Sequence, residues 1–279
     1  MRLRFFSLFT ALVAVAIIAL LVVTALFAPY IAPHRPKAGS LTDRLQPPFW
    51  QEGGSPEHLL GTDVLGRDIF SRLIYGARTS LAVAVLAILV AGSVGSALGI
   101  AAGYFGGWID TLIMRAVDLA FSFPAILLAM VLAVVFEPSF FNIILVISLI
   151  LWAEYARMAR GETLKVKEMD FVALARVAGV SSFRIMLRHI LPNVASALVV
   201  LATLQVGIVI ILESSLSFLG VGIPPPTPDW GTMIADGRSY IVTAWWLSVV
   251  PGVAIVLTVL SFNLLGDTLT ELLNPARQS

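Results

Sequence analysis

Cysteine is absent from this chain of 279 residues, which excludes disulfides, thiolate metal sites and a cysteine nucleophile. Charge is also scarce, because Asp, Glu, Lys and Arg make up only 13% of the residues, against roughly 25% in a typical soluble domain. Hydrophobic residues account for 58% of the chain. This composition predicts a membrane protein.

Two catalytic motifs are missing as well. No G-x-x-x-x-G-K-[ST] sequence occurs, so we expect no phosphate-binding loop of that type and no ATP hydrolysis by this route. An intramembrane hydrolase would need a nucleophile and a base at membrane depth, but no G-x-S-x-G sequence occurs, and His34, His58 and His189 fall in loops or at the edge of an apolar run. Because these histidines are scattered along the chain, we predict neither a metal site nor a bound cofactor.

What the chain does contain is a set of long runs without Asp, Glu, Lys or Arg. A helix needs about 20 apolar residues to cross the hydrocarbon core of a membrane. We therefore predict an all-α integral membrane protein with one domain, residues 1–279, and six transmembrane helices. The first run exceeds the roughly 7 to 15 residues of a signal-peptide core, so we interpret it as a retained anchor. The predicted crossings are residues 6–28, 79–103, 116–136, 139–159, 192–216 and 243–266.

The distribution of basic residues predicts the orientation. Placing the N-terminus in the cytoplasm puts eleven Lys and Arg residues on that side and seven outside, in agreement with the positive-inside rule. Both termini are then cytoplasmic, together with a loop at 160–191. The loops at 29–78 and 217–242 face the exterior.

Both outer loops have local structure that the sequence predicts. Ile69, Leu73 and Ile74 recur at helical spacing after Asp68, which favours a short amphipathic helix at the outer interface leading into the second crossing. In the other loop, the prolines at 224–226 forbid a regular helix, so we expect an ordered loop there.

The second crossing contains a doubled small-xxx-small pattern, Gly95, Gly99 and Gly103, which lets another helix approach closely. The pattern leaves two partners open. The glycines could pack against a helix of another subunit or against a helix of the same chain.

The cytoplasmic loop reads as two short helices that meet at a glycine. Asp170 can cap a helix that begins at Phe171, and Gly179 can end it in a left-handed turn. Ser181 or Ser182 can then cap a second helix. Pro192 follows and can occupy the first turn of the fifth crossing, where its missing N–H has no cost.

This loop resembles that of the permease subunits of bacterial ATP-binding-cassette importers. The family signature reads roughly Glu-Ala-Ala, three residues, Gly, nine residues, Ile-x-Leu-Pro. Ala173-Leu174-Ala175, Gly179 and Leu191-Pro192 stand at those spacings, while Ala173 replaces the Glu and His189 replaces the Ile. The segments LGTDVLGRDIFSRLIYGARTSL, FSFPAI, ESSLSFLGVGIPPPTPDWGTMI and FNLLGDTL resemble the second, C-type permease of the dipeptide, oligopeptide and nickel branch.

The resemblance implies a type I importer permease fold with a cytoplasmic coupling helix between helices four and five. It also implies a bacterial inner membrane location and several partners: a homologous permease in a heterodimer, two ATP-binding subunits or domains, and a periplasmic or lipid-anchored binding protein. Membrane lipid is a further expected partner, and nucleic acid is not expected as a partner. The coupling residues would be Phe171, Ala173, Ala175, Arg176, Gly179, Ser181, Arg184 and Pro192.

Several alternatives remain open. The basic loop could instead rest on anionic lipid, for which Arg184 and Arg188 would serve equally well. The chain could be a self-sufficient secondary carrier, although inverted repeats and midplane ionisable residues are not evident. Within the importer reading, a di- or oligopeptide is the first choice of substrate and nickel or another small solute is the second, because no His/Asp/Glu cluster marks the crossings.

Glu213, next to Ser214, is the charge that the sequence leaves without an explanation. It follows a long charge-free run, and no basic residue is near it in sequence. It could sit in water near the outer mouth, pair with another crossing or subunit, or stay protonated. We favour a structural role over a role in the pathway or gate.

Overall fold

The computed structural model describes the backbone of residues 2–273 and the side chains of residues 10–272. Within that part the regular structure is helical, apart from two isolated β-bridges, Gly39 with Arg67 and Thr62 with Asp68. The main helices are α1 (Arg2–Leu26), α2 (Ala28–Ile31), α3 (Ile69–Phe105), α4 (Gly107–Phe121), α5 (Ala125–Val135), α6 (Phe140–Val166), α7 (Asp170–Val177), α8 (Ser182–Ile185), α9 (Leu191–Phe218), α10 (Trp230–Gly237) and α11 (Trp246–Leu273). Short 3-10 turns lie at Leu41–Asp43 and Arg238–Tyr240, and a π-helical turn lies at Met186–Ile190.

Four helical segments of the described chain are long and apolar enough to cross a membrane: α3, α6, the continuous segment Ser182–Phe218, and Trp246–Leu272. The pair α4 and α5 makes a fifth if the two are one bent crossing. The described part of α1, Thr10–Leu26, is apolar but shorter. The all-helical membrane class predicted from the sequence is therefore confirmed, with four or five candidate crossings in the described residues.

The third predicted crossing, 116–136, is not one helix. Its chain turns by 92° between α4 and α5. Pro124 lies at this break, and proline both lacks an N–H and disfavours helical backbone at the residue before it. The break follows from the FSFP sequence itself, although the size of the bend depends on tertiary packing.

The helix predicted at Ile69–Ile74 is present, but it is not a separate element before the second crossing. Its residues form the first turns of α3, which continues for 37 residues without interruption. Asp68 is the N-cap, and its carboxylate accepts a hydrogen bond of 2.7 Å from the N–H of Ser71.

The glycines of α3 pack inside this chain. A Cβ at Gly95 would overlap the carbonyl oxygen of Trp152, and one at Gly99 would overlap the carbonyl oxygen of Ala156, both on α6. A Cβ added at Gly103 would likewise lie only 2.8 Å from the Cβ of Thr163, which is also on α6. The glycines thus pack against α6 of the same chain, as the same-chain alternative expects.

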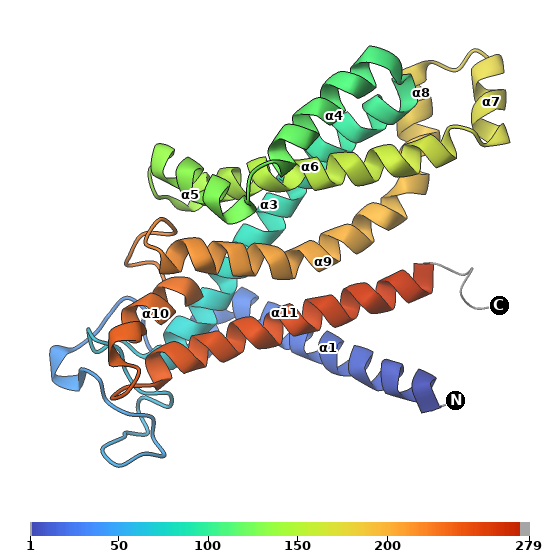
Figure 1. Ribbon diagram of the computed structural model, residues 1–279. Helices are drawn as coiled ribbons and strands as arrows, with labels where there is room; N and C mark the ends of the chain where they lie inside the picture. Colours follow the sequence, from blue (N-terminus) through green and yellow to red (C-terminus); the bar gives the residue numbers. More distant parts are fainter. Residues whose placement is uncertain (1, 274–279) are drawn as a thin grey trace.

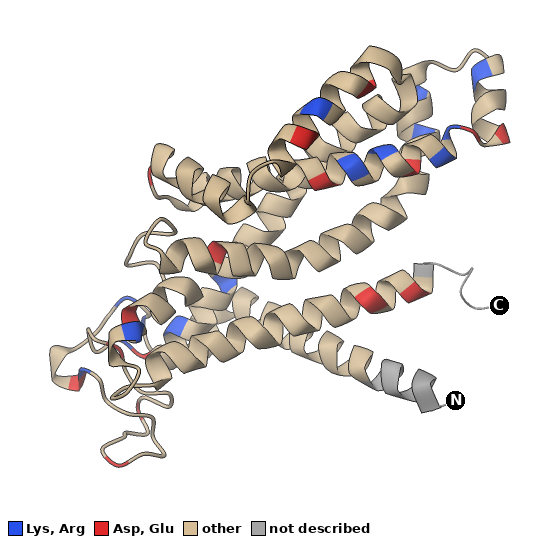
Figure 2. Ribbon diagram, in the orientation of Figure 1, with Lys and Arg blue, Asp and Glu red and all other residues tan. Residues whose placement is uncertain are grey.

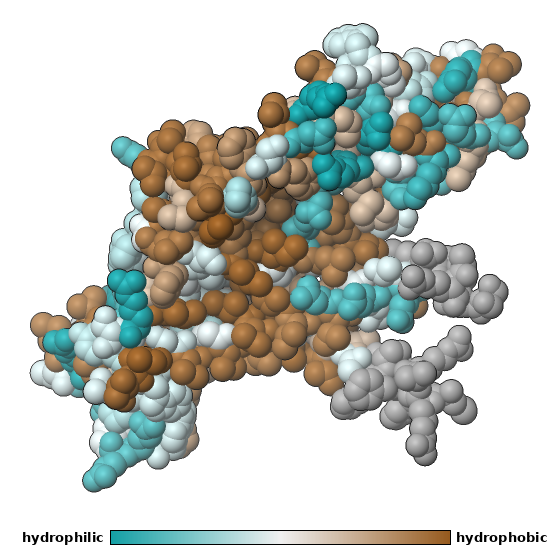
Figure 3. Space-filling model, in the orientation of Figure 1, coloured by the Kyte–Doolittle hydropathy of each residue, from teal (hydrophilic) through white to brown (hydrophobic). Residues whose placement is uncertain are grey.

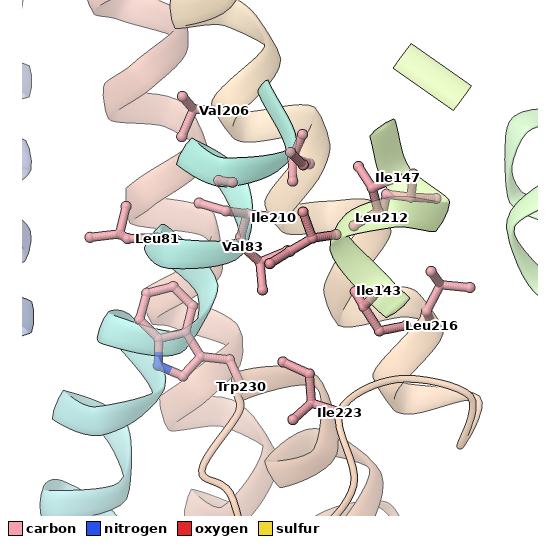
Figure 4. Close-up of a cluster of buried hydrophobic side chains, with 14 of the residues drawn as sticks. Leu81, Val83, Ile143, Ile147, Val206, Ile210, Leu212, Leu216, Ile223 and Trp230 are labelled. Carbon is pink, nitrogen blue, oxygen red and sulfur yellow. The ribbon is translucent and has the colours of Figure 1, made fainter. Parts of the chain in front are cut away.

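The main core lies where α3, α6 and α9 meet (Figure 4), and Trp230 at the start of α10 covers one end of it. Charged residues gather towards the two ends of the molecule and are sparse in the middle, as Figure 2 shows. A broad hydrophobic surface occupies that middle region (Figure 3). This distribution suits a protein whose waist is surrounded by lipid.

The long loop 32–68, with α10, forms one end of the molecule, and α7 with α8 forms the other (Figure 1). We call these the α10 end and the α7 end. The start of α1 and the end of α11 point towards the α7 end (Figure 1).

Candidate functional site

The turn after α7 has the conformation that the sequence predicts. Gly179 has φ +74°, in the left-handed region. The N–H of Val180 donates to the carbonyl of Ala175 at 3.1 Å, and the N–H of Gly179 donates to that of Arg176 at 3.1 Å. These two bonds make a Schellman motif, which satisfies the last carbonyls of α7 and fixes the direction of the following chain.

The two predicted side-chain caps are absent. Asp170 is the first residue of α7 and not its cap, since Met169 occupies that position without a side-chain hydrogen bond. Ser181 does occupy the N-cap position of α8, but its hydroxyl makes no capping bond. The loop conformation therefore depends on the glycine turn and on apolar packing.

The second loop helix continues into the long helix that follows. Through the π-helical turn, the N–H of Leu191 donates to the carbonyl of Met186. Pro192 lies in the first turn of α9 and has no N–H to donate, which explains a local departure from the α-helical pattern. Ser182–Phe218 is consequently one continuous helical segment, so we expect a movement of α8 to be transmitted directly to α9.

A second core attaches the loop to the rest of the protein. Val172 of α7, Ile185 of α8 and Ile190 are fully buried and pack in one cluster with Ile100 of α3. Polar contacts add to it, because Lys167 donates to the carbonyl of Gly103 at 2.9 Å. The guanidinium of Arg176 lies 5.6 Å from the ring centroid of Tyr104. The loop is thus fixed against α3 as well as joined to α9.

The exposed surface of this loop, at the α7 end of the molecule, carries several large apolar side chains. Val177 is 88% exposed, and Leu174 and Phe183 are each 69% exposed. Among the residues predicted to couple, Phe171, Ala173, Arg176, Gly179, Ser181, Arg184 and Pro192 are exposed, whereas Ala175 is half-buried. Exposed apolar side chains on a rigid protrusion are typical of a protein-docking surface.

A groove of about 570 Å³ lies beside the loop, between α3 and α9. Its lining is mostly aliphatic, with Ser93 and Ser96 as the polar exceptions on α3. The loop contributes to one end of it. Representative lining residues are Ile88, Tyr155, Phe183, Met186, Leu191 and Leu198.

Glu213 is fully buried near the α10 end and is not in water. Its carboxyl group accepts a hydrogen bond from Ser217 at 3.0 Å, and from Ser80 of α3 and Ser214 at 3.4 Å each. It also interacts with the carboxyl group of Asp229, the buried N-cap of α10. Glu213 therefore joins α9 to α3 and α10, and Ser214 is one of its donors.

Asp229 and Trp230 were not recognised from the sequence as important for this region. Asp229 caps α10 by accepting from the N–H of Thr232 at 2.9 Å. The indole N–H of Trp230 donates to the carbonyl of Leu73 at 3.0 Å, which ties α10 to α3. The Asp-Trp-Gly sequence after a proline-rich stretch was the available indication, because Asp is a favoured residue at the N-cap of a helix.

The prediction that the histidines are scattered is wrong for two of the three. In the outer loop His34 and His58 come together with Asp68, and one potential ligand atom from each lies within 4.8 Å of the others. No sequence spacing indicates this cluster, because loop tertiary structure brings its members together.

Comparisons with known proteins agree with this architecture. Residues 95–279 match the family described as binding-protein-dependent transport system inner membrane component. That match covers more than half of the chain. The chain belongs to this family. Residues 1–48 of the permease also match the N-terminal transmembrane domain of oligopeptide transport permease C.

Curated relatives cover nearly all of this permease. The dipeptide transport system permease protein DppC of Haemophilus influenzae is 40% identical over 265 residues, 95% of this chain and 90% of the relative. The glutathione transport system permease protein GsiD of Pectobacterium atrosepticum is 41% identical over 276 residues, 99% and 90%. The di/tripeptide transport system permease protein DppC of Pseudomonas aeruginosa is 41% identical over 256 residues, 92% and 84%.

Proposed function

We propose that this permease forms half of the translocation pathway of an ATP-driven importer of di- and oligopeptides. The single observation that carries the proposal is mechanical: the apolar protrusion at α7 is fixed to α3 and continuous with α9, the two helices that border the groove. A force applied to that protrusion would change the width of the groove. The names of the three relatives support a peptide as the substrate class.

The protrusion, residues Asp170–Ile185, is the proposed coupling element. The exposed side chains of Leu174, Val177 and Phe183 would enter a hydrophobic groove of a separate ATP-binding subunit. Because the Schellman turn and the buried Val172 hold α7 rigidly, closure of the ATPase pair would rotate α7 as one body. Anionic lipid is the weaker candidate, since it would attract the arginines but leave the apolar tip without a specific partner.

This proposed role implies an orientation in the membrane and a set of partner proteins. The α7 end faces the cytoplasm with both termini, and six crossings result if α1 and the bent pair α4–α5 each span the membrane. A homologous permease would close the groove from the other side, two ATP-binding subunits or domains would bind below, and a periplasmic or lipid-anchored protein would deliver the substrate to the α10 end. Nickel is the second choice of substrate, because the polar side chains in the described groove lining are only Ser93, Ser96 and Tyr155, and none of them supplies the imidazole or carboxylate ligands that nickel prefers.

Reconstitution tests the proposal. We expect liposomes that contain this permease with its partner permease, ATP-binding subunits and binding protein to take up peptide when ATP is supplied. Vesicles with the two permeases alone should be inactive. Ion-driven peptide uptake by the permeases without the ATP-binding subunits would contradict the proposal and favour a secondary carrier, and ATP-dependent uptake of nickel but not of peptide would change the substrate.

A further inference from the structure

Three separate segments of the long loop at the α10 end converge on one point. His34 follows α2, His58 lies in the middle of the loop, and Asp68 caps α3. The Nδ1 atom of His58 lies 3.0 Å from Oδ1 of Asp68, and the Nδ1 atom of His34 lies 3.8 Å from Oδ2 of Asp68. The two imidazole rings face each other at 4.7 Å between centroids.

These separations suit the first shell of a small divalent cation. With bonds of about 2.0 to 2.1 Å, two ligand atoms of a tetrahedral zinc ion are about 3.3 Å apart. The observed distances of 3.0 and 3.8 Å bracket that value. All three ligand atoms lie within 4.8 Å of one another, so binding would draw them closer together around the ion.

A histidine–aspartate hydrogen bond without metal accounts for only part of the cluster. It explains His58, which pairs with Asp68 at hydrogen-bonding distance. It does not explain His34, whose Nδ1 atom is buried without a hydrogen-bond partner although the side chain as a whole is 38% exposed. The inner nitrogen of His34 thus points at the carboxylate from too far away to bond to it, while the outer edge of the ring remains in contact with solvent.

The surroundings already hold the ligands in place. The backbone N–H of His34 donates to the hydroxyl of Ser71 at 3.0 Å, and Oδ2 of Asp68 accepts from the backbone N–H of Ser71 at 2.7 Å. The bond to Asp68 orients its carboxylate in the way that outer contacts orient the ligands of metal sites, and the bond from His34 holds its backbone beside the start of α3. A neighbouring backbone bond, from the N–H of Asp63 to the carbonyl of Arg67 at 3.0 Å, stabilises the turn just before Asp68.

We propose that His34, His58 and Asp68 bind a divalent transition-metal ion, with Zn²⁺ as the best fit to two imidazoles and one carboxylate. The His34 side chain is 38% exposed, so the cluster lies next to solvent, from which a water molecule would come as the fourth ligand. Bound metal would fasten the segment after α2 to the start of α3 and so stiffen the α10 end. The site lies outside the groove and does not depend on the proposed transport function.

Metal content of the purified complex tests the site. We expect the chelator-treated complex, dialysed against Zn²⁺ without ATP or peptide, to bind one more ion per copy of this chain than the same complex with His34→Ala. Elemental analysis measures the difference. The His189→Gln complex, altered at the third histidine and far from the site, should bind as many ions as the unaltered complex. Equal zinc content with and without His34→Ala would overturn the proposal.

Cobalt provides a second measurement that a general loss of folding would not imitate. Co²⁺ in a site with two imidazoles and a carboxylate should give visible absorption bands of a four- or five-coordinate ion, and His34→Ala should remove them. Thermal unfolding of both complexes checks that they are folded, and Zn²⁺ should raise the midpoint of the unaltered complex only. A midpoint that rises equally in both complexes would place the ion elsewhere and contradict the assignment.

Discussion

Gly179 and Glu213 are single residues that determine local structure at the two ends of this permease. At the α7 end, Gly179 supplies a left-handed backbone that turns the chain from α7 to α8. At the other end, the buried carboxyl group of Glu213 gathers hydroxyl donors from α3 and α9. Neither residue lines the groove, so we expect each to act by holding helices in place.

Replacing Gly179 by valine should uncouple ATP turnover from uptake. A β-branched side chain in the left-handed region costs on the order of 1 to 3 kcal/mol. Open space surrounds this glycine, so the effect would come from the backbone and not from a clash. We expect near-normal membrane insertion, continuing ATP hydrolysis, and uptake reduced several-fold when both rates are measured in the same vesicles.

Two matched variants separate this effect from a general loss of stability. Gly179→Asn should keep coupling, because asparagine tolerates left-handed backbone. Gly161→Ala places a methyl group in equally open space within α6, where no positive φ is required, and should be silent. Normal coupling in Gly179→Val would mean that the turn does not transmit force.

Among the described elements, helices α3 and α6 share the most extensive contact, and the glycines of α3 let the backbone of α6 approach. The small-residue pattern in the sequence predicted a close contact with another helix. It did not indicate whether that helix belongs to the same chain or to another subunit. That choice depends on which helix packs there, which only tertiary structure determines.

The same limit explains which elements could be predicted. Long charge-free runs predicted the apolar helices, since membrane crossing imposes length and composition directly. The left-handed turn at Gly179 followed from its local sequence. The 92° bend at Pro124 and the meeting of His34 with His58 did not, because one depends on packing around the proline and the other on loops that are far apart in sequence.

A methyl group on Gly99 should weaken the α3–α6 pair. Its Cβ would overlap the carbonyl oxygen of Ala156, so the helices must move apart at a cost of roughly 1 to 3 kcal/mol. We expect Gly99→Ala to lower the thermal midpoint of the purified complex. Gly252→Ala, in α11 with no atom of this chain near the added carbon, should leave the midpoint almost unchanged. Equal midpoints for both variants would indicate that the close approach of the two helices contributes little.

In the whole molecule, α3 and α9 connect the apolar protrusion to the α10 end, where we propose that the binding protein delivers the substrate. Because α8 continues into α9 and the loop core includes Ile100 of α3, a displacement of α7 reaches both sides of the groove. The buried contacts of Glu213 and Trp230 would then carry that displacement to α10. In the proposed transport cycle, alternate opening of the two ends would then be a rigid-body movement, which requires no unfolding of a helix.

Cross-linking would locate the partner of the protrusion. The absence of cysteine from this chain gives a clean background for Val177→Cys, at a position that is 88% exposed. We expect a short cross-linker, with one thiol-reactive and one photo-activatable group, to join it to the ATP-binding subunit, with a yield that changes when ATP is bound. Val242→Cys, at a position 91% exposed at the α10 end, is the matched control and should react only with the binding protein. If Val177→Cys reacted only with phospholipid, or if Val242→Cys reached the ATP-binding subunit, the proposed direction of coupling would be wrong.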